Sequence, residues 1–362
     1  MNAITIGLDI AKSVFQVHGE DASGKVVLQT RLRRTQVEPF FTTLAPAVVG
    51  IEACGSAHYW GRTLQTLGHE VRLIPAAYVK PFVKRNKTDA RDAEAICVAV
   101  RRPDMRFVPI KSIEQQAARG LEGARELLVK QRTQLINSVR GRLGEYGIVA
   151  AQGPRGFAAL VAFIEAEDPK IPAAALVALR PLLEQARSLA EGIAELEAKI
   201  VEAAKADATM RLLATIPGVG YLTAHAIVAA VGAGKQFASA RDFAAWVGLT
   251  PRQHSSGGKR RSGPISRQGD TRLRTLFALG AATLMRHART RSERATAWQR
   301  GILARRPMKV ATIAQAAKTA RIAFAILTSG EPYRAAKGTA ARATPMDNAG
   351  ALPTGATTAM SL

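Results

Sequence analysis

Residues 4–11 read ITIGLDIA, an apolar run rich in β-branched side chains that carries one carboxylate, Asp9. Such a run predicts a buried β-strand. It is followed at residues 14–33 by VFQVHGEDASGKVVLQTRLR, in which the turn signal DASGK separates two strand-like runs and predicts a hairpin. Three β-strands are therefore expected within residues 4–33.

Working outward, helix and strand patterns alternate after this hairpin. Helices are predicted for VEPFFTTLA (37–45) and HYWGRTLQTLG (58–68), and strands for VVGIEACG (48–55) and HEVRLIPA (69–76). This order predicts an α/β domain with a mixed sheet over residues 1–110.

The remaining sequence is mostly helical in character. Residues 112–146 and about 181–206 are rich in Ala, Leu, Glu, Arg and Gln, and PRGFAALVAFIEAEDPKIP (154–172) separates them. We interpret 111–206 as a helical linker or coiled-coil region, in which ordinary packing helices and a dimerisation element remain open alternatives. A mostly α-helical domain is expected at 207–330. A tail rich in Ala, Gly, Thr and Pro at 331–362 is predicted to be disordered.

The charge of the chain points to a polyanionic partner. Lys and Arg number 51 against 28 Asp and Glu, which gives a formal net charge of +23. This excess favours nucleic acid, and the sequence predicts no transmembrane run, membrane-binding helix or secretory signal. The two cysteines, Cys54 and Cys97, lack CxxC spacing, so neither a zinc site nor a disulfide is expected, and a cytoplasmic protein is predicted.

Four carboxylates of the first domain follow a pattern suited to metal binding. Asp9 and Glu52 lie at or near the ends of predicted strands, and Asp89 and Asp92 are spaced i, i+3 at the start of a predicted helix. If the strands are adjacent, oxygen ligands of this kind suit Mg²⁺ or Mn²⁺. Asp89 alone is more readily explained as a helix N-cap or first-turn acid.

Cations flank the DxxD pair. Lys84, Arg85 and Lys87 precede it, which is consistent with a phosphate backbone passing beside metal-binding acids.

In the second half, RLLATIPGVGYLTAHAIVAAVG (211–232) predicts a helix-hairpin-helix element. Gly218 and Gly220 would let a phosphate approach the backbone at the N-terminus of the second helix. A plain connection between two packed helices is the alternative.

A dense cationic stretch follows. Between Pro251 and Arg291 there are ten Lys and Arg residues and one acid, Asp270. We predict nucleic-acid contacts here, from Lys259, Arg260, Arg261, Arg267 and Arg272. The stretch contains HSSGGKRRSG (254–263), which composition alone leaves open as a linker, a phosphate cradle or a loop that carries a nucleophile.

Taken together, these motifs resemble those of the DEDD-type insertion-sequence transposases, a family guided by a bridge RNA. The matching text is IGLDIAK, IEACGSAHYW and KRNKTDARDAEAI in the first half, and IPGVG, FAAWVGLTPRQHSSGGKRRSG and RQGDTRLRTLFALGAA in the second. The resemblance implies a RuvC-like, RNase H-like domain that binds Mg²⁺ through Asp9, Glu52, Asp89 and Asp92. It also implies that Ser256, the serine directly before glycine, is the nucleophile that attacks DNA phosphate.

Our hypothesis is a DNA recombinase that excises and inserts an insertion sequence, with a noncoding RNA choosing donor and target DNA. We expect a homo-oligomer, dimer or tetramer, with composite active sites, in the bacterial cytoplasm at the nucleoid. One rival is a structure-specific, junction-resolving endonuclease that uses water. Another is a helix-hairpin-helix DNA-binding protein whose acids are structural.

Overall fold

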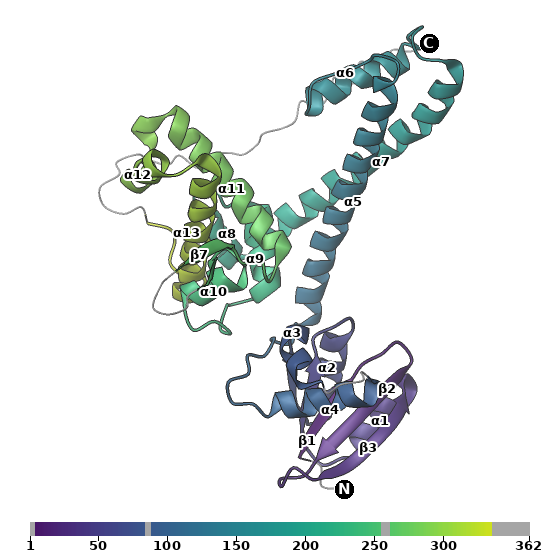
Figure 1. Cartoon of the computed structure of the whole chain (residues 1–362), viewed down its shortest axis with the longest axis vertical. Coiled ribbons are helices and arrows are strands. Elements are labelled where there is room, and N and C mark those ends of the chain that lie inside the picture. The colour runs from purple at the N-terminus through teal and green to yellow at the C-terminus, as the bar shows by residue number, and fades with distance from the viewer. Residues whose placement is uncertain (1–3, 84–87, 255–260, 335–362) are drawn as a thin grey trace. The chain divides into compact units, whose positions relative to one another are not determined.

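The structure of the protein is a computed structural model that describes residues 4–83, 88–254 and 261–334. The chain forms two compact units, Met1–Gly120 and Leu121–Leu362 (Figure 1).

The first unit is built on a five-stranded mixed sheet with strand order β3-β2-β1-β4-β5. The strands are β1 (Thr5–Asp9), β2 (Val14–Glu20), β3 (Val26–Arg33), β4 (Val48–Glu52) and β5 (Glu70–Ile74). β2 pairs antiparallel with both β1 and β3, whereas β1, β4 and β5 are parallel. The predicted hairpin and mixed sheet are confirmed.

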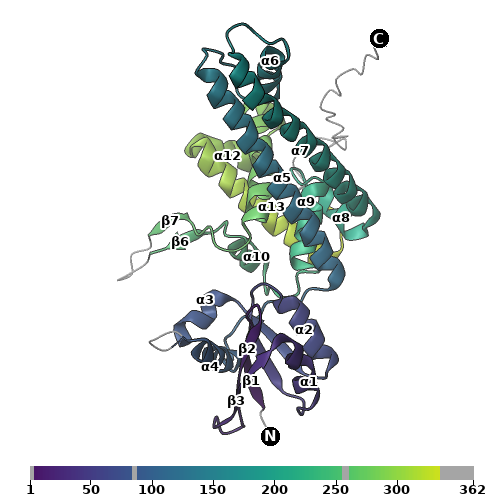
Figure 2. The ribbon, with the colours of Figure 1, turned by 90° about the vertical axis from the view of Figure 1, so that its right-hand side faces the viewer.

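Helices cover both faces of this sheet. α1 (Val37–Thr42) and α2 (Ala57–Thr66) lie on one face, and α4 (Asp89–Val100) lies on the other (Figure 2). Two short helical turns, α3 (Ala76–Val79) and η2 (Lys80–Phe82), come before α4, and η1 (Arg34–Gln36) links β3 to α1.

The pleat of β1 and β4 sorts their residues between the two faces. Ile6, Leu8, Val49 and Ile51 are fully buried and share a core cluster with Trp60 and residues of α1 and α2. Gly7 and Gly50 alternate with them and face α4. A Cβ added at Gly7 would lie 2.0 Å from the carbonyl oxygen of Ala93, so glycine permits α4 to pack directly on β1.

The second unit begins within a long helix, α5 (Ile113–Gly144), followed by α6 (Pro154–Glu165) and α7 (Ala173–Ala206). α5 matches the predicted helix closely. α7 starts eight residues before the predicted position, and Pro181 lies inside it. The segment interpreted as a separator contains α6, whose Leu160 and Ile164 pack with apolar residues of α5 and α7.

The rest of this unit is mostly helical, as predicted. Its helices are α8 (Ala208–Ala214), α9 (Tyr221–Val231), α10 (Ala240–Trp246), α11 (Thr271–Thr290), α12 (Ala297–Arg305) and α13 (Met308–Ser329), with a short turn η3 (Ser292–Arg294). α13 is long and apolar enough to cross a membrane by composition. Its Ala316, Ala320 and Ala323 are fully buried in the core with α10 and α11, as in a core helix of a globular unit.

A two-stranded hairpin was not predicted. β6 (Pro251–Gln253) and β7 (Ser262–Ile265) pair antiparallel between α10 and α11. Three- and four-residue strands with arginine, glutamine and proline carry too little apolar alternation to be recognised from sequence.

Candidate functional site

Two of the predicted metal ligands end neighbouring strands. Asp9 is the last residue of β1 and Glu52 the last of β4, and these strands are parallel and adjacent. Because side chains alternate along a strand and Gly7 and Gly50 face α4, Asp9 and Glu52 also belong to the face that α4 covers. The carboxyl edge of the sheet therefore brings both acids to one side.

The other two acids open the helix on that face. Thr88 is the N-cap of α4, and its hydroxyl accepts a hydrogen bond from the backbone N–H of Arg91 at 3.4 Å. Asp89 and Asp92 follow in the first turn, where the helix dipole favours negative charge. The spacing of three residues places them on one face of the helix.

Three of these carboxylates form a cluster. Asp9, Asp89 and Asp92 each offer an oxygen within 4.8 Å of the others; Asp89 is exposed, and Asp9 and Asp92 are half-buried. An all-oxygen donor set beside solvent fits a hard divalent cation that keeps some of its water, as Mg²⁺ does. Glu52 is not a member of this close group among the described residues.

The pKa of the Cys54 thiol is affected by the carboxylates of Glu52 and Asp9. Burial raises the pKa of its thiol, and the negative charges of Glu52 and Asp9 raise it further. Both acids therefore act on the same small region, although Glu52 stands outside the close group. A thiol held in its protonated form is a weak ligand, which leaves the oxygens as the donors.

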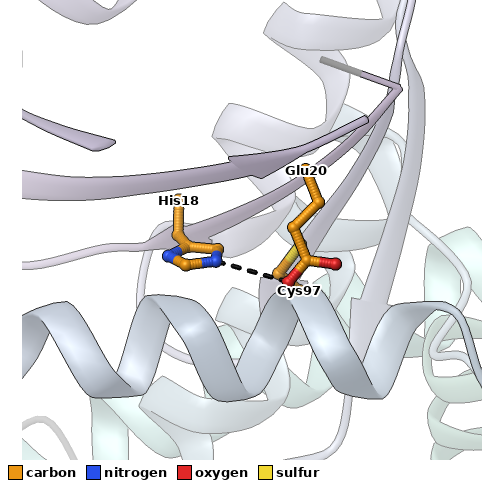
Figure 3. Close-up of side chains that lie close together, drawn as sticks. All are labelled: His18, Glu20 and Cys97. Carbon is orange, nitrogen blue, oxygen red and sulfur yellow. Dashed lines mark hydrogen bonds and ion pairs between the residues drawn. The ribbon is translucent and has the colours of Figure 1, made fainter. Parts of the chain in front are cut away.

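A second cluster lies deeper under α4 (Figure 3). His18 and Glu20 of β2 and Cys97 of α4 are buried, with His18 Nε2 3.4 Å from Glu20 Oε1. Arg101 donates to Glu20 Oε2 at 2.5 Å. The Cys97 thiol donates to the Thr5 carbonyl at 3.6 Å, and burial raises its pKa to about 12. We interpret this group as a polar network that joins α4 to the sheet, since Glu20 already has a cationic partner and the thiol stays protonated.

The predicted nucleophile lies beyond the described residues. Ser256, Lys259 and Arg260 fall in 255–260, which the structure does not describe. Their flanks are the two strands of the β6–β7 hairpin, and the backbone N–H of His254 donates to the carbonyl of Arg261 at 2.8 Å. The described residues on both sides of Ser256 in sequence thus belong to a paired hairpin.

The base of this hairpin is tightly packed. A Cβ at Gly269 would lie 1.7 Å from the Trp246 carbonyl oxygen, and one at Gly248 would lie 2.2 Å from that of Gln268. The described strands stand out from the helices of their unit (Figure 2).

Comparison with known proteins decides the family. Residues 6–148 match the DEDD transposase domain of the IS110 type, described as "Transposase", and residues 210–296 match "Transposase IS116/IS110/IS902 family". A "Probable family 20 transposase" of Pseudomonas aeruginosa is 47% identical over 338 residues, which cover 92% of this chain and 99% of that protein. The chain belongs to the IS110/IS116 family of transposases.

Other members are similar over nearly the same length. The "Transposase for insertion sequence element IS1111A" of Coxiella burnetii is 41% identical over 91% of each chain. The "Transposase for insertion sequence element IS1328" of Yersinia enterocolitica is 38% identical over 92% of this chain and 99% of its own. The family acts on DNA in transposition, and its DEDD domain implies the use of a divalent metal.

In this transposase, the two glycines predicted to contact nucleic acid differ in their surroundings. Gly218 has a φ of +82°, and a Cβ there would lie 3.1 Å from the Gly280 carbonyl oxygen and 2.9 Å from the Leu284 side chain of α11. Gly220 is exposed at the N-cap of α9, with open space beside it. Gly218 therefore serves the packing of the turn, and Gly220 presents the accessible backbone.

The cations predicted to contact nucleic acid also differ in their exposure and in whether they form an ion pair. Arg272 forms an ion pair with Glu126 of α5 at 2.9 Å, with its side chain 18% exposed. Arg261 and Arg267 are exposed. Lys84, Arg85 and Lys87 lie outside the described residues.

One buried contact between a histidine and a carboxylate had no sequence prediction. His225 of α9 and Glu122 of α5 approach to 2.7 Å, with side chains 2% and 3% exposed. A lone histidine inside the apolar helix YLTAHAIVAAV was the available signal, and its partner 103 residues earlier could not be identified from spacing.

Proposed function

We propose that this IS110-family transposase exchanges DNA strands through a covalent intermediate on Ser256, with Mg²⁺ bound by Asp9, Asp89 and Asp92 and supported by Glu52. The observation that carries the proposal is the cluster of three carboxylates at the carboxyl edge of the sheet. Mn²⁺ suits the same oxygen ligands. The five-stranded sheet with helices on both faces supports an RNase H-like, RuvC-like description of the first unit.

The chemistry is a transesterification. The hydroxyl oxygen of Ser256 attacks a DNA phosphorus, a serine phosphodiester bond forms, and one phosphorus–oxygen bond to a DNA sugar breaks. The serine proton is lost and the departing sugar oxygen gains one, so the number of phosphodiester bonds is conserved. Attack by another sugar hydroxyl then releases the serine and joins a new pair of strands, without an external energy source.

The side chains divide the electrostatic work. A bound Mg²⁺ ion supplies positive charge beside the attacked phosphate, as in other phosphoryl transfers. Arg261, with Lys259 and Arg260 beside it in sequence, neutralises the phosphate that approaches the loop. The carboxylates hold their geometry because α4 is fixed against β1 at Gly7.

In this proposal a noncoding RNA, and not the protein, selects the donor and target DNA. A net charge of +23 exceeds what solubility requires and supports binding of both DNA and a noncoding bridge RNA. We further propose that the acids and the serine come from different subunits of a homo-oligomer, acting at the nucleoid in the cytoplasm. The organisation into residues 1–110, 111–206, 207–330 and 331–362 belongs to the same proposal.

The test compares serine variants on DNA that carries the ends of the insertion sequence. Ser256→Ala should lower strand exchange by at least about 1,000-fold, because the nucleophile is lost. It should still bind DNA and RNA. Ser255→Ala, which removes the neighbouring hydroxyl, is the matched control and should keep its activity.

The same assay separates the rival nuclease mechanism. If water were the nucleophile, Ser256→Ala would cleave DNA normally and no protein would remain attached to DNA on a denaturing gel. If the acids were only structural, no magnesium-dependent cleavage would occur with the unaltered protein.

A further inference from the structure

An open pocket of about 570 Å³ lies in the first unit, on the face of the sheet opposite α4. It is formed by the turn after β3, by α1 and by the first turn of α2. The lining residues are Arg34, Thr35, Glu38, Pro39, Thr42, Tyr59 and Trp60. Its size is within the range of small-ligand sites.

The floor of the pocket is aromatic and fixed. Trp60 is 3% exposed, and its ring meets Phe15 edge-to-face at 5.1 Å. The guanidinium of Arg34 lies over the Trp60 ring at 5.3 Å, and the Arg34 backbone N–H donates to the Ser13 carbonyl at 3.0 Å. The indole is therefore fixed by packing, and the exposed Arg34 side chain places its guanidinium over the indole ring.

Above this floor one aromatic ring is exposed. Tyr59 is 47% exposed, and it contacts Trp60 edge-to-face at 5.1 Å. This contact orients the phenol ring at the rim of the pocket. An oriented, exposed ring that lines the same pocket as a guanidinium is a stacking platform for a planar group.

One cation lies at the rim of the pocket. Arg34, exposed directly after the edge strand β3, lines the pocket together with the acid Glu38, whereas Arg31 and Arg33 alternate with the buried Leu32 and belong to the opposite face of the sheet. Cations interleaved with aromatic rings are how proteins bind single-stranded nucleic acid, with phosphates on arginine and bases on the rings.

The pocket is at the same edge of the sheet as the acids. β2 is antiparallel to both β1 and β3, so β1, β3 and β4 all direct their carboxyl ends to one edge. In the ladder Gln16 pairs with Asp9, and Val14, two residues before it, pairs with Arg33. Arg34, which follows Arg33 directly, thus lies at the edge of the sheet that carries the carboxylate cluster, and the pocket opens on the opposite face.

We propose that Tyr59, Trp60 and Arg34 form a subsite for one unpaired nucleobase of a nucleic-acid strand, with Arg34 as the cation beside its phosphate. The inference rests on the proposed function and adds a defined position where a strand is anchored at the sheet edge that carries the acids, on the opposite face of the sheet. DNA and RNA both carry the chemistry that the subsite recognises, a planar base next to a phosphate.

The experiment uses the full-length protein and single-stranded oligonucleotides that contain one 5-iodouracil, made as DNA and as RNA. Ultraviolet light couples this base to a neighbouring aromatic ring. Tyr59 and Trp60 share the tryptic peptide 35–62. We expect the cross-link on this peptide, and a base-paired duplex should compete poorly because its bases are stacked within the helix.

Tyr59→Ala should weaken binding of the single strand by about 5- to 150-fold, the range for loss of one stacked base. Tyr59→Phe should retain binding because it keeps the ring. Tyr78→Ala is the matched control, because Tyr78 is also 47% exposed in the same unit but outside the pocket. Since both tyrosines are exposed, the variants should fold.

The inference is overturned if Tyr59→Ala binds as tightly as Tyr78→Ala, or if the cross-link maps away from peptide 35–62. Cross-linking by DNA alone, or by RNA alone, identifies which strand the subsite takes. The two failures are distinguishable. A Ser256 adduct that forms normally while Tyr59→Ala changes nothing refutes the subsite alone, whereas absence of any nucleic-acid binding refutes the proposed function.

Discussion

Replacing Gly7 by alanine tests whether the close approach of α4 to the sheet builds the metal site. The added Cβ would lie 2.0 Å from the carbonyl oxygen of Ala93 and 2.6 Å from the backbone nitrogen of Cys97. Ordinary contact begins at 3.4 Å, so relief of the closest overlap requires a shift of about 1.4 Å (3.4 minus 2.0). Both atoms belong to the backbone of α4, and no side-chain rotation can relieve them.

The consequence reaches the acids because Asp89 and Asp92 open the same helix. We expect overpacking to lower the free energy of unfolding by about 1–3 kcal/mol. A displacement of about 1 Å at a reacting centre costs roughly 100-fold in rate. Gly7→Ala should therefore weaken Mn²⁺ binding, measured by calorimetry on the full chain, and slow magnesium-dependent DNA cleavage by about that factor.

Two further variants make the result interpretable. Gly141→Ala places a Cβ in open space on the exposed side of α5, and it should leave metal binding unchanged. Gly50→Ala meets the Val100 Cβ at 2.8 Å, a milder overlap with a side chain, and should give an intermediate loss if Gly7→Ala is too unstable to purify. Unchanged metal affinity and cleavage in a folded Gly7→Ala protein would refute the role assigned to α4.

Three other predictions concern stability and binding. Glu122→Leu should destabilise the second unit by about 1–3 kcal/mol in chemical denaturation, because it leaves the buried Nδ1 of His225 without its hydrogen-bond partner; an unchanged free energy of unfolding would contradict this. Burial, then Lys111 and Arg62, lowers the pKa of His58 from 6.5 to about 4, so the unfolded chain binds a proton between these values that the folded chain does not. Thermal stability should fall as pH drops through that window, and His58→Asn should flatten the decline. Arg261→Ala should reduce the salt dependence of DNA binding by about one charge, whereas Arg272→Ala should change it less because Arg272 is already paired with Glu126; equal effects would argue against this distinction.

Local pattern was sufficient for the first unit. Apolar runs with β-branched residues predicted the strands, and DASGK predicted the hairpin, because these signals depend on residues close in sequence. The DxxD spacing predicted that Asp89 and Asp92 share the first turn of a helix, which α4 confirms. Strand adjacency then brings Asp9 into the cluster.

Contacts between residues that are far apart in the sequence could not be predicted. Arg272 had the composition of a phosphate ligand, yet Glu126 lies 146 residues away in sequence and pairs with it. Gly218 had the pattern of a phosphate-binding turn, but its packing against Gly280 depends on how α11 crosses it. The exposed Tyr59 beside Arg34 follows from the tertiary packing of Trp60 on Phe15.

The start of α7 shows how local cues can mislead. The composition of the sequence predicts a helix from about residue 181 to 206. The helix begins instead after Pro172, at Ala173, and tolerates Pro181 in its third turn. Packing of Leu176, Leu179 and Leu183 against α5 and α6 outweighs the lost hydrogen bond.

The most direct test of the central claim is to trap the intermediate. The full-length transposase is incubated with magnesium, its guide RNA and DNA carrying the element ends, quenched in denaturant and digested for mass spectrometry. A nucleotide linked through phosphate to Ser256 is the predicted result, and it should disappear in Asp92→Asn. Cleaved DNA with no protein attached, or a nucleotide on another residue, would contradict the account.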